Sequence, residues 1–439
     1  MKTKQLVRAA LLAVVALAFA CALSWRGDAQ GQAQPRWWKG NLHTHSLWSD
    51  GDDYPEMIAD WYRGHGYQFL ALSDHNTLQQ GERWIDVAKS RGGMAAFERY
   101  RARFGADWVE SRTRDGVLEA RLKRLDEFRG RFEARGRFLL IQSEEITDKY
   151  GNLPVHINAT NLSSLIRPRG GDSVREVMQN NVDAVMEQRA AIRQPMFPHL
   201  NHPNFGWGVT AEDLAAVRGE RFFEVYNGHP GVRNYGDDRH ASTERVWDIA
   251  LSLRLSRPEG EPLYGVGVDD AHNYHEMAAN RSNPGRGWVM VRATELTPAA
   301  IVAAMEAGDF YASSGVTLRR VERRPNRLSL AIDTAPGVEY VTRFYGTRRG
   351  FDAASRAVRG EDGQPLYATR VYGEGVGALL AETRGASASY TLRGDELYVR
   401  AVVTSSKLKE NPYAAGDFEA AWVQPVIPPA PQENAAAPR

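Results

Sequence analysis

The chain of 439 residues is long enough for one large domain together with a smaller accessory domain. Its 55 lysines and arginines nearly balance its 54 aspartates and glutamates. This balance argues against a nucleic-acid partner, because nucleic-acid-binding domains are typically strongly basic or carry a basic stripe. The single cysteine, Cys21, excludes a fold stabilised by disulfides.

The pattern of residues 1–33 predicts a secretory signal peptide. A basic start precedes an apolar run over residues 9–23, which is shorter than the ~20 residues of a membrane-spanning helix. Small residues then suit signal peptidase, so we expect a periplasmic or secreted protein without stable membrane insertion after cleavage. Lipoprotein anchoring at Cys21 is the less favoured alternative, because residues 18–20 match a lipoprotein box poorly.

Between about residues 37 and 314, short apolar runs that are typical of strands alternate with helical patterns. Strands are predicted at residues 40–44, 67–73, 138–142, 155–159, 195–199, 222–226, 263–268 and 288–291. Helices are predicted at residues 55–64, 174–192, 243–253 and 297–307, with a short helix opened by a capping box at residues 210–213. A charged stretch is expected to form a helical insertion at about residues 90–136. The alternation of strands and helices favours an α/β protein with a parallel barrel or a doubly wound sheet.

The pattern changes after residue 315, because apolar and polar residues now alternate with the period of half-buried strands. Such strands are predicted at residues 327–333, 338–345, 388–392 and 396–404. They predict a small C-terminal β-sandwich domain over residues 316–424. The Pro- and Ala-rich residues 425–439 are predicted to be a disordered tail.

Histidines and carboxylates follow the predicted strands in five clusters. The clusters are His43-Thr44-His45 with Asp50, then Asp74-His75, Glu144-Glu145 with His156, His199 with His202, and Asp269-Asp270 with His272. In barrels and open α/β sheets, the carboxyl ends of the strands meet at one face and carry the active residues. Imidazoles and carboxylates gathered there are the ligands that a multinuclear metal site needs.

In this order, the clusters resemble the motifs of the polymerase and histidinol phosphatase (PHP) superfamily, over roughly residues 38–315. Residues 223–230 and 308–315 look more like the branch of carbaryl-hydrolase-like metallohydrolases, some of which cleave carbamate esters. The resemblance implies a distorted (β/α)7 TIM-like barrel, here over residues 36–315. It also implies two or three divalent metal ions as cofactors, usually zinc, manganese or iron.

Carried over residue by residue, the resemblance implies three metal sites. His43, His45, Glu145 and Asp270 would hold the first metal, Glu145, His156 and His202 the second, and Asp50, His75 and His272 the third. The neighbouring residues Asp74, Glu144, His199 and Asp269 are expected to orient these ligands.

The resemblance implies catalytic roles for Glu145, Asp270, His272 and Asp50. Substrate contacts are predicted from position near the strand ends for Asn227, His229, His275 and Arg286. An arginine can grip a phosphate with two parallel hydrogen bonds, although hydrogen bonding within a loop or simple exposure is the alternative at each of these positions.

The leading hypothesis is a secreted enzyme, a metal-dependent hydrolase that uses a metal-bound hydroxide on a phosphoester of a small molecule. It would act as a phosphatase or phosphodiesterase. Hydrolysis of a carbamate or carboxyl ester is the alternative that the branch resemblance implies. An alternative of another class is a non-catalytic, metal-containing periplasmic binding module.

Overall fold

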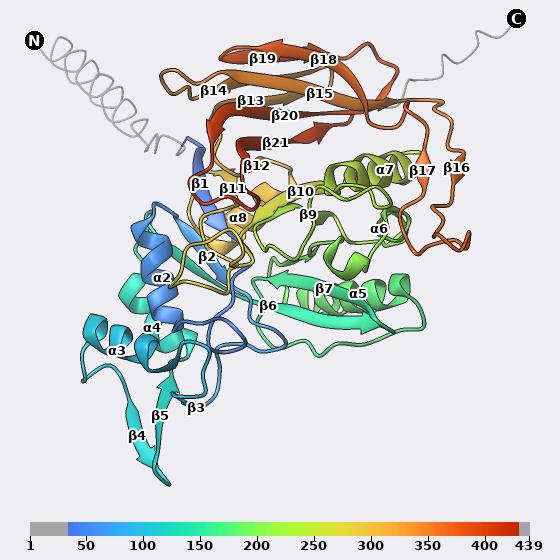
Figure 1. Ribbon diagram of the computed structural model, residues 1–439. Coiled ribbons are helices and arrows are strands. Elements are labelled where there is room, and N and C mark those ends of the chain that lie inside the picture. The colour runs from blue at the N-terminus through green and yellow to red at the C-terminus, as the bar shows by residue number, and fades with distance from the viewer. Residues whose placement is uncertain (1–33, 430–439) are drawn as a thin grey trace, which may run out of the picture. The chain divides into compact units, whose positions relative to one another are not determined.

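The computed structural model describes residues 34–429, so the predicted signal segment and Cys21 lie outside the described residues. One 13-stranded sheet dominates the fold, with the strand order β10-β9-β8-β7-β6-β2-β1-β11-β12-β21-β20-β15-β18 (Figure 1). Its strands before residue 315 are β1 (Arg36–Asn41), β2 (Phe69–Leu72), β6 (Leu139–Tyr150), β7 (Leu153–Thr160), β8 (Phe197–Leu200), β9 (Phe222–Asn227), β10 (Tyr264–Val268), β11 (Trp288–Ala293) and β12 (Phe310–Ser313). The sheet mixes parallel and antiparallel pairs, and helices pack against it.

The helices begin where the sequence supplies a cap. Those outside the insertion are α2 (Pro55–Gly64), α5 (Val174–Ile192), η1 (Phe205–Trp207), α6 (Ala211–Ala216), α7 (Thr243–Leu255) and α8 (Pro298–Glu306). α2 starts with Pro55, whose fixed φ suits the first helical position. Ser173 caps α5 by accepting a hydrogen bond from the Glu176 amide, and Thr210 and Asp213 form a capping box on α6. The predicted boundaries of these helices agree with the structure because capping residues and prolines act on the residues next to them.

The predicted distorted (β/α)7 TIM-like barrel is matched only in part. Strand pairs β1–β2, β2–β6, β8–β9 and β9–β10 are parallel, but β6, β7 and β8 pair antiparallel. The turn from β6 to β7 is too short for a helical crossover, so these strands form a hairpin. No strand ladder joins β10 back to β1 within residues 34–429. The segments that follow them meet at one parallel bridge, Thr44 with Ala271.

One of the apolar clusters gathers side chains from most of these strands. Side chains from β1, β2, β6, β8, β9 and β10 meet in this cluster, including Phe69, Ile141, Phe197, Phe222 and Val266. All five are at most 2% exposed. Burying such side chains gives about 1.5–3 kcal/mol each. The core therefore fixes the strand ends relative to one another, and with them the loops that the ends carry.

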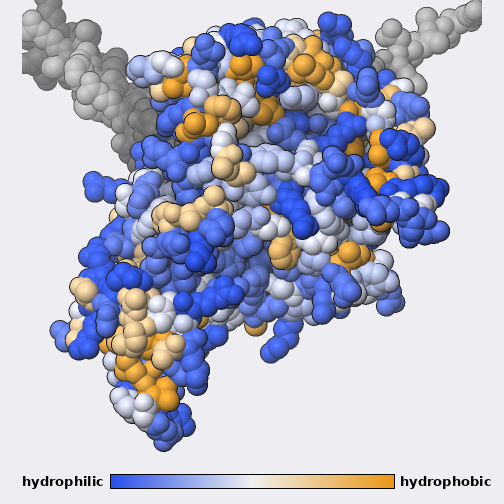
Figure 2. Space-filling view, viewed as in Figure 1, coloured by the Kyte–Doolittle hydropathy of each residue, from blue (hydrophilic) through white to orange (hydrophobic). Residues whose placement is uncertain are grey.

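The insertion contains more than the predicted helices. It comprises β3 (Arg83–Asp86), α3 (Gly93–Phe104), β4 (Ser111–Arg114), β5 (Val117–Leu122) and α4 (Leu125–Phe132). The three strands form a separate sheet in the order β3-β5-β4. β3 and β5 consist largely of half-buried residues, and Figure 2 shows apolar surface over this small sheet. The prediction of a helical insertion was incomplete because the short, charged β4 has no apolar alternation.

The C-terminal strands continue the large sheet. They are β13 (Leu318–Arg324), β14 (Arg327–Ile332), β15 (Tyr340–Arg348), β16 (Ser355–Arg356), β17 (Val371–Tyr372), β18 (Ala378–Arg384), β19 (Ser387–Thr391), β20 (Glu396–Leu408) and β21 (Phe418–Val426). β21 pairs with β12 on one side and with β20 on the other. The small sheet β13-β14-β19 packs against β15, β20 and β21 through a core that includes Leu330, Phe344 and Val403. This arrangement does not confirm a separate β-sandwich, because β21, β20, β15 and β18 belong to the large sheet.

The prediction of a disordered tail over residues 425–439 is wrong at its first two residues. Pro425 and Val426 belong to β21, and Val426 pairs with Val399 of β20. A proline is compatible with a strand where its missing N–H is not needed for a ladder hydrogen bond. Residues 430–439 lie outside the described part of the chain.

Candidate metal centre

All nine predicted ligands lie at the carboxyl-end face of the strands. His43 and His45 follow β1, His75 follows β2, His202 follows β8, and Asp270 and His272 follow β10. Glu145 and His156 lie on the β6–β7 hairpin, and Asp50 lies on the loop before α2. Their donor atoms form groups that are close enough to share a cation: His43, His45 and Asp270; His43, Glu145 and His202; and His45, Asp50, His75 and His272. The structure therefore brings together every residue that was expected to bind metal.

Glu145 lies at the centre of the cluster. Its Oε2 is 3.2 Å from Nε2 of both His43 and His45, and 2.9 Å from Nδ1 of His75. Its Oε1 is 2.8 Å from Nδ1 of His156 and accepts a hydrogen bond from Asn201 at 2.8 Å. The two carboxylate oxygens thus face two different sets of imidazoles, which is the geometry of a carboxylate that bridges two cations.

His43, His45 and Asp270 form a compact group around Glu145. Oδ1 of Asp270 lies 3.2 Å from His43 Nε2 and 3.1 Å from His45 Nε2. In a tetrahedral zinc site with zinc–nitrogen distances near 2.05 Å, the donor atoms are about 3.3 Å apart. The observed separations therefore fit donor atoms arranged around one cation.

Asp50, His75 and His272 form a second group at the more exposed edge of the cluster. Asp50 Oδ1 lies 3.5 Å from His75 Nε2 and 3.3 Å from His272 Nε2. The Nδ1 atom of His272 faces the backbone carbonyl of Asp270 at 2.9 Å. A hydrogen bond there places the proton on Nδ1 and leaves the Nε2 lone pair free for a metal. The side chain of Asp50 is 37% exposed and that of Glu145 only 1%, so the cluster is open to solvent on the Asp50 side.

His156 and His202 complete the third group with Glu145. The Nε2 atom of His202 lies 3.6 Å from Glu145 Oε1. Nδ1 of His156 is buried and has no hydrogen-bond partner among the described residues, although Glu145 Oε1 is close to it. At 2.8 Å, the nitrogen can either donate a proton to this carboxylate or share a cation with it. A divalent metal fits this position.

The carboxylates and imidazoles of the cluster shift one another's pKa values. The ion-pair partners of Glu145 and Asp270 within residues 34–429 are all histidines. Burial raises the pKa of Glu145, but the imidazoles of His75 and His43 hold that pKa well below its usual range. Burial, together with the imidazoles of His272 and His75, lowers the pKa of His45 to about 3. His45 is therefore neutral at pH 7, as a metal-binding imidazole must be. Burial lowers the pKa of His75, but Glu145 and Asp50 raise it to about 9, so a cation bound there would have to displace a proton.

Glu224 is a functional residue that the sequence analysis missed. Its Oε1 lies 2.6 Å from His43 Nδ1 and 3.3 Å from His199 Nε2. Its Oε2 accepts hydrogen bonds from the His202 amide and from Asn227, both at 2.8 Å. The carboxylate therefore fixes the ring of His43 and the backbone at His202. A glutamate inside the apolar strand Phe222–Asn227 was the available signal.

The four residues that were expected to orient ligands differ in position. His199 acts through Glu224, and Asp74 accepts hydrogen bonds from Ser46, Ser49 and Gln79, which shape the loop that carries Asp50. Glu144 faces away from the cluster and accepts a hydrogen bond from the Ile166 amide. Asp269 accepts hydrogen bonds from Tyr62 and from the amides of residues 285–287. Glu144 and Asp269 therefore support loops rather than predicted ligands.

The four predicted substrate contacts also lie in different environments. Asn227 is buried and donates to Asp270 at 3.1 Å, so it positions a carboxylate. His229 lies beside the cluster, with its ring 5.5 Å from that of His272. His275 lies 3.0 Å from the backbone oxygen of Asp52. Arg286 is fully buried and donates to backbone carbonyls that include Gly228 and Ala278. Asn227 and His229 are thus the two that lie against predicted ligands, and Nδ1 of His229 accepts a hydrogen bond from the Gly231 amide.

Arg91 is a second residue that the sequence analysis missed. It lies in the insertion, and its guanidinium is 3.8 Å from Asp50 Oδ2 with the side chain 58% exposed. The turn packs closely against the loop at Gly92, where a Cβ would lie 2.2 Å from the backbone oxygen of Asp52, so only glycine fits there. The insertion therefore places a cationic side chain at the open edge of the cluster.

Asp270 has a backbone conformation that few non-glycine residues adopt. Its φ is 51°, in the left-handed region. Aspartate tolerates this region better than most residues, but the conformation still costs free energy. Hydrogen bonds from the Asp270 amide to His43 and from the His45 amide to Ala271 hold the segment in place. The strained residue is the one whose carboxylate faces His43 and His45.

Comparisons with known proteins give no family assignment. No family model matches the chain, and no curated protein matches it. A two-domain protein from Bacteroides vulgatus that contains a predicted PHP-like metal-dependent phosphoesterase aligns at 15% identity with a TM-score of 0.39, over 89% of this chain and 95% of that one. A candidate metal-dependent phosphoesterase from Bifidobacterium adolescentis aligns at 13% identity with a TM-score of 0.27, over 54% of this chain and 89% of that one. Among residues 34–429 no helix has the length and apolarity to span a membrane. The candidate metal centre therefore rests on the geometry of its own residues.

Proposed function

We propose that the protein is a metal-dependent hydrolase that cleaves phosphoesters of small molecules. The observation that carries this proposal is the position of Glu145, whose two carboxylate oxygens face two sets of imidazoles. Divalent ions held there would lower the pKa of a bound water and stabilise negative charge that develops in the transition state. The resemblance to the PHP superfamily supports the same class of reaction.

Different residues of the chain would bind the cations, position the carboxylates and face the substrate. Glu145 and Asp270 would hold the cations, and amide hydrogen bonds from Asn201 and Asn227 keep the two carboxylates in position. Asp50 and His272 lie at the open edge, where they can bind a cation beside the arriving substrate. Preorganised charges of this kind act without reorganisation at the moment of reaction.

Arg91 favours a phosphoester over a neutral ester. Its guanidinium lies beside Asp50 at the only edge of the cluster where a predicted ligand is more than a third exposed. A guanidinium recognises phosphate oxygens well, whereas a neutral carbamate offers it no charge. An anionic substrate would therefore gain an interaction that the alternative carbamate substrate lacks.

We further propose that the chain is exported and acts in the periplasm or outside the cell, as the pattern of residues 1–33 suggests. N-terminal sequencing of the protein recovered from its native compartment tests this point. A first residue between positions 28 and 36 would support export, and an intact Met1 would refute it.

The test of the enzymatic proposal combines metal analysis with a substrate panel. The wild-type protein should contain two or three divalent ions per chain and hydrolyse p-nitrophenyl phosphate or bis-p-nitrophenyl phosphate faster than 1-naphthyl N-methylcarbamate. Glu145→Gln should lose both metal and turnover. Glu144→Gln is the matched control, because the neighbouring glutamate contacts no predicted ligand. Full activity of Glu145→Gln, or faster carbamate than phosphoester hydrolysis, would refute the corresponding part of the proposal.

A further inference from the structure

A long segment between β15 and β18, residues 349–377, leaves the C-terminal strands and lies against α6 and α7; we call it the strap (Figure 1). Thr369 accepts a hydrogen bond from the Ala211 amide at 3.0 Å, and Tyr372 donates to Glu212 at 3.0 Å. The guanidinium of Arg245, in the first turn of α7, donates to the backbone carbonyls of Tyr372, Gly373 and Val376. These contacts fix the strap on the helices.

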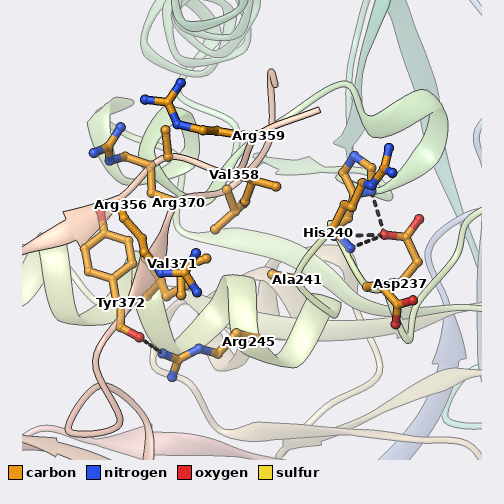
Figure 3. A pocket seen from close by; sticks show the side chains of 15 residues that line it. Asp237, His240, Ala241, Arg245, Arg356, Val358, Arg359, Arg370, Val371 and Tyr372 are labelled. Carbon is orange, nitrogen blue, oxygen red and sulfur yellow. Dashed lines mark hydrogen bonds and ion pairs between the residues drawn. The ribbon is translucent and has the colours of Figure 1, made fainter. Parts of the chain in front are cut away.

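A cavity of about 680 Å³ lies between the strap and the start of α7. Figure 3 shows Arg356, Arg359 and Arg370 of the strap on one side and His240 with Asp237 on the other. Arg245 lies along α7 below them. The volume is within the range of about 300–1,000 Å³ that is usual for small-molecule sites.

The lining of the cavity is strongly cationic. Five arginines line it, at positions 239, 245, 356, 359 and 370, against the two aspartates Asp237 and Asp238. The carboxylate of Asp237 is hydrogen-bonded within its own turn: it accepts hydrogen bonds from the amides of Arg239 and His240 and contacts the His240 ring. The lining therefore carries a net positive charge.

Most of this positive charge has no carboxylate partner. Arg359 donates to the Gly363 carbonyl and Arg370 to Ser355, both of which are uncharged acceptors. The backbone of Arg356 pairs with Val371, and its guanidinium has no hydrogen-bond or ion-pair partner between positions 34 and 429. Only Arg239 pairs with an acid, the exposed Glu361. Four of the five arginines are exposed, so solvent screens their mutual repulsion, and an anion would be held chiefly by direct hydrogen bonds from the guanidinium groups.

The cavity borders the wall that also faces the predicted metal centre. Trp207 of η1 stacks on the His240 ring with centroids 3.8 Å apart. Phe205 of the same short helix lies 5.0 Å from the His202 ring and 6.3 Å from that of His229. One element thus contacts the metal cluster through one aromatic side chain and the cavity through another.

We propose that this cavity is a binding site for a small polyanion, a molecule with at least two phosphate or carboxylate groups. The arginines of the strap supply the charge, and the loop before α7 supplies the opposite wall. Arginine is suited to this role because its planar fork of donors matches phosphate and carboxylate oxygens. The site is separate from the metal centre and does not depend on the proposed hydrolase activity.

The test is isothermal titration of the full-length protein with inorganic diphosphate and, in a second arm, with citrate. Arg356→Gln and the double variant Arg356→Gln/Arg359→Gln should weaken binding by about tenfold or more, because each removes a charged hydrogen-bond donor. Arg324→Gln is the matched control, since Arg324 is exposed on β13 and lies outside the cavity lining. Thermal melting and circular dichroism check that each variant is folded.

The outcomes separate the possible sites. Binding that is lost in the Arg356 variants but kept in Arg324→Gln supports the proposal, and the stronger of the two probes shows whether phosphate or carboxylate is preferred. Binding that survives in the Arg356 variants and is lost in Arg91→Gln would place the anion at the metal cluster and overturn the proposal. If neither diphosphate nor citrate binds at about 1 mM, the proposal is also overturned. Hydrolysis of the substrate panel is measured separately, so failure of one proposal does not affect the other.

Discussion

Glu224→Gln tests whether a carboxylate outside the predicted ligand set controls metal binding. In the wild type, Oε1 faces the His43 ring nitrogen at 2.6 Å, and Oε2 accepts from the His202 amide and from Asn227. A glutamine has only one oxygen. Its NH2 group must therefore face either the imidazole or the two amide donors, and at least one donor loses its acceptor.

The expected loss follows from this geometry. Removing a partner that orients a metal-binding histidine costs 10–100-fold in metal affinity, or about 1.4–2.7 kcal/mol. The upper part of this range is expected, because the carboxylate serves the His43 ring and the His202 backbone together. His43 should also bind metal less well because its tautomer is no longer fixed.

The assay is competition between the protein and a chelator for zinc, which yields the dissociation constant without reference to activity. Glu144→Gln is the control, since it makes the same chemical change at a carboxylate that faces away from the cluster. A dissociation constant for Glu224→Gln within about twofold of the wild type would refute the assigned role, provided that circular dichroism shows the variant to be folded.

Three further predictions address substrate recognition and stability. Arg91→Ala should raise KM for p-nitrophenyl phosphate by about tenfold with little change in kcat, because the guanidinium binds the anion in the ground and transition states alike. The control is Lys89→Ala in the same turn, which should match the wild type. Equal KM values for the two variants would contradict this role of Arg91. Burial raises the pKa of Glu220 to about 8, so this residue is protonated in the folded protein at neutral pH and its cost to stability grows as the pH rises from about 4.5 to 8. The melting temperature of Glu220→Gln relative to the wild type should therefore increase from pH 5 to pH 8, and a constant difference would disprove the assignment. Asp248→Asn should lower the free energy of unfolding by about 3 kcal/mol in urea denaturation, because the buried Arg400 guanidinium loses the carboxylate that accepts two of its hydrogen bonds and keeps only Glu244, at 3.3 Å. A loss under about 1 kcal/mol would contradict this account.

Local signals explain which parts of the fold could be predicted from the sequence. α2 and α5 begin and end where proline, serine caps and apolar spacing place them. The pairing of β12 with β21 could not be predicted, because it joins segments more than a hundred residues apart and depends on packing rather than on periodicity. The small sheet β3-β5-β4 was missed for a related reason, since Ser111–Arg114 is fully exposed and shows no alternation.

The residues of the candidate site also include some that the sequence could predict and some that it could not. The nine predicted ligands come together because each follows a strand end or lies on the β6–β7 hairpin. Glu144 could have been excluded from the site, because successive side chains of a strand point to opposite faces and Glu145 was already placed inside. The role of Glu224 could not be predicted without knowing which face of β9 meets His43. The role of Arg91 could not be predicted without knowing the path of the exposed insertion. The periodicity of the sequence shows neither.

The position of β21 between β12 and β20 has a consequence for biosynthesis. Until residues 418–426 leave the ribosome, β12 has a free edge, and unpaired edges invite association with other chains. The part of the chain that carries the predicted metal ligands is therefore synthesised long before its sheet is complete. Nascent chains would need protection at this edge, and a premature stop before residue 418 should yield an aggregating product even though every predicted ligand is present.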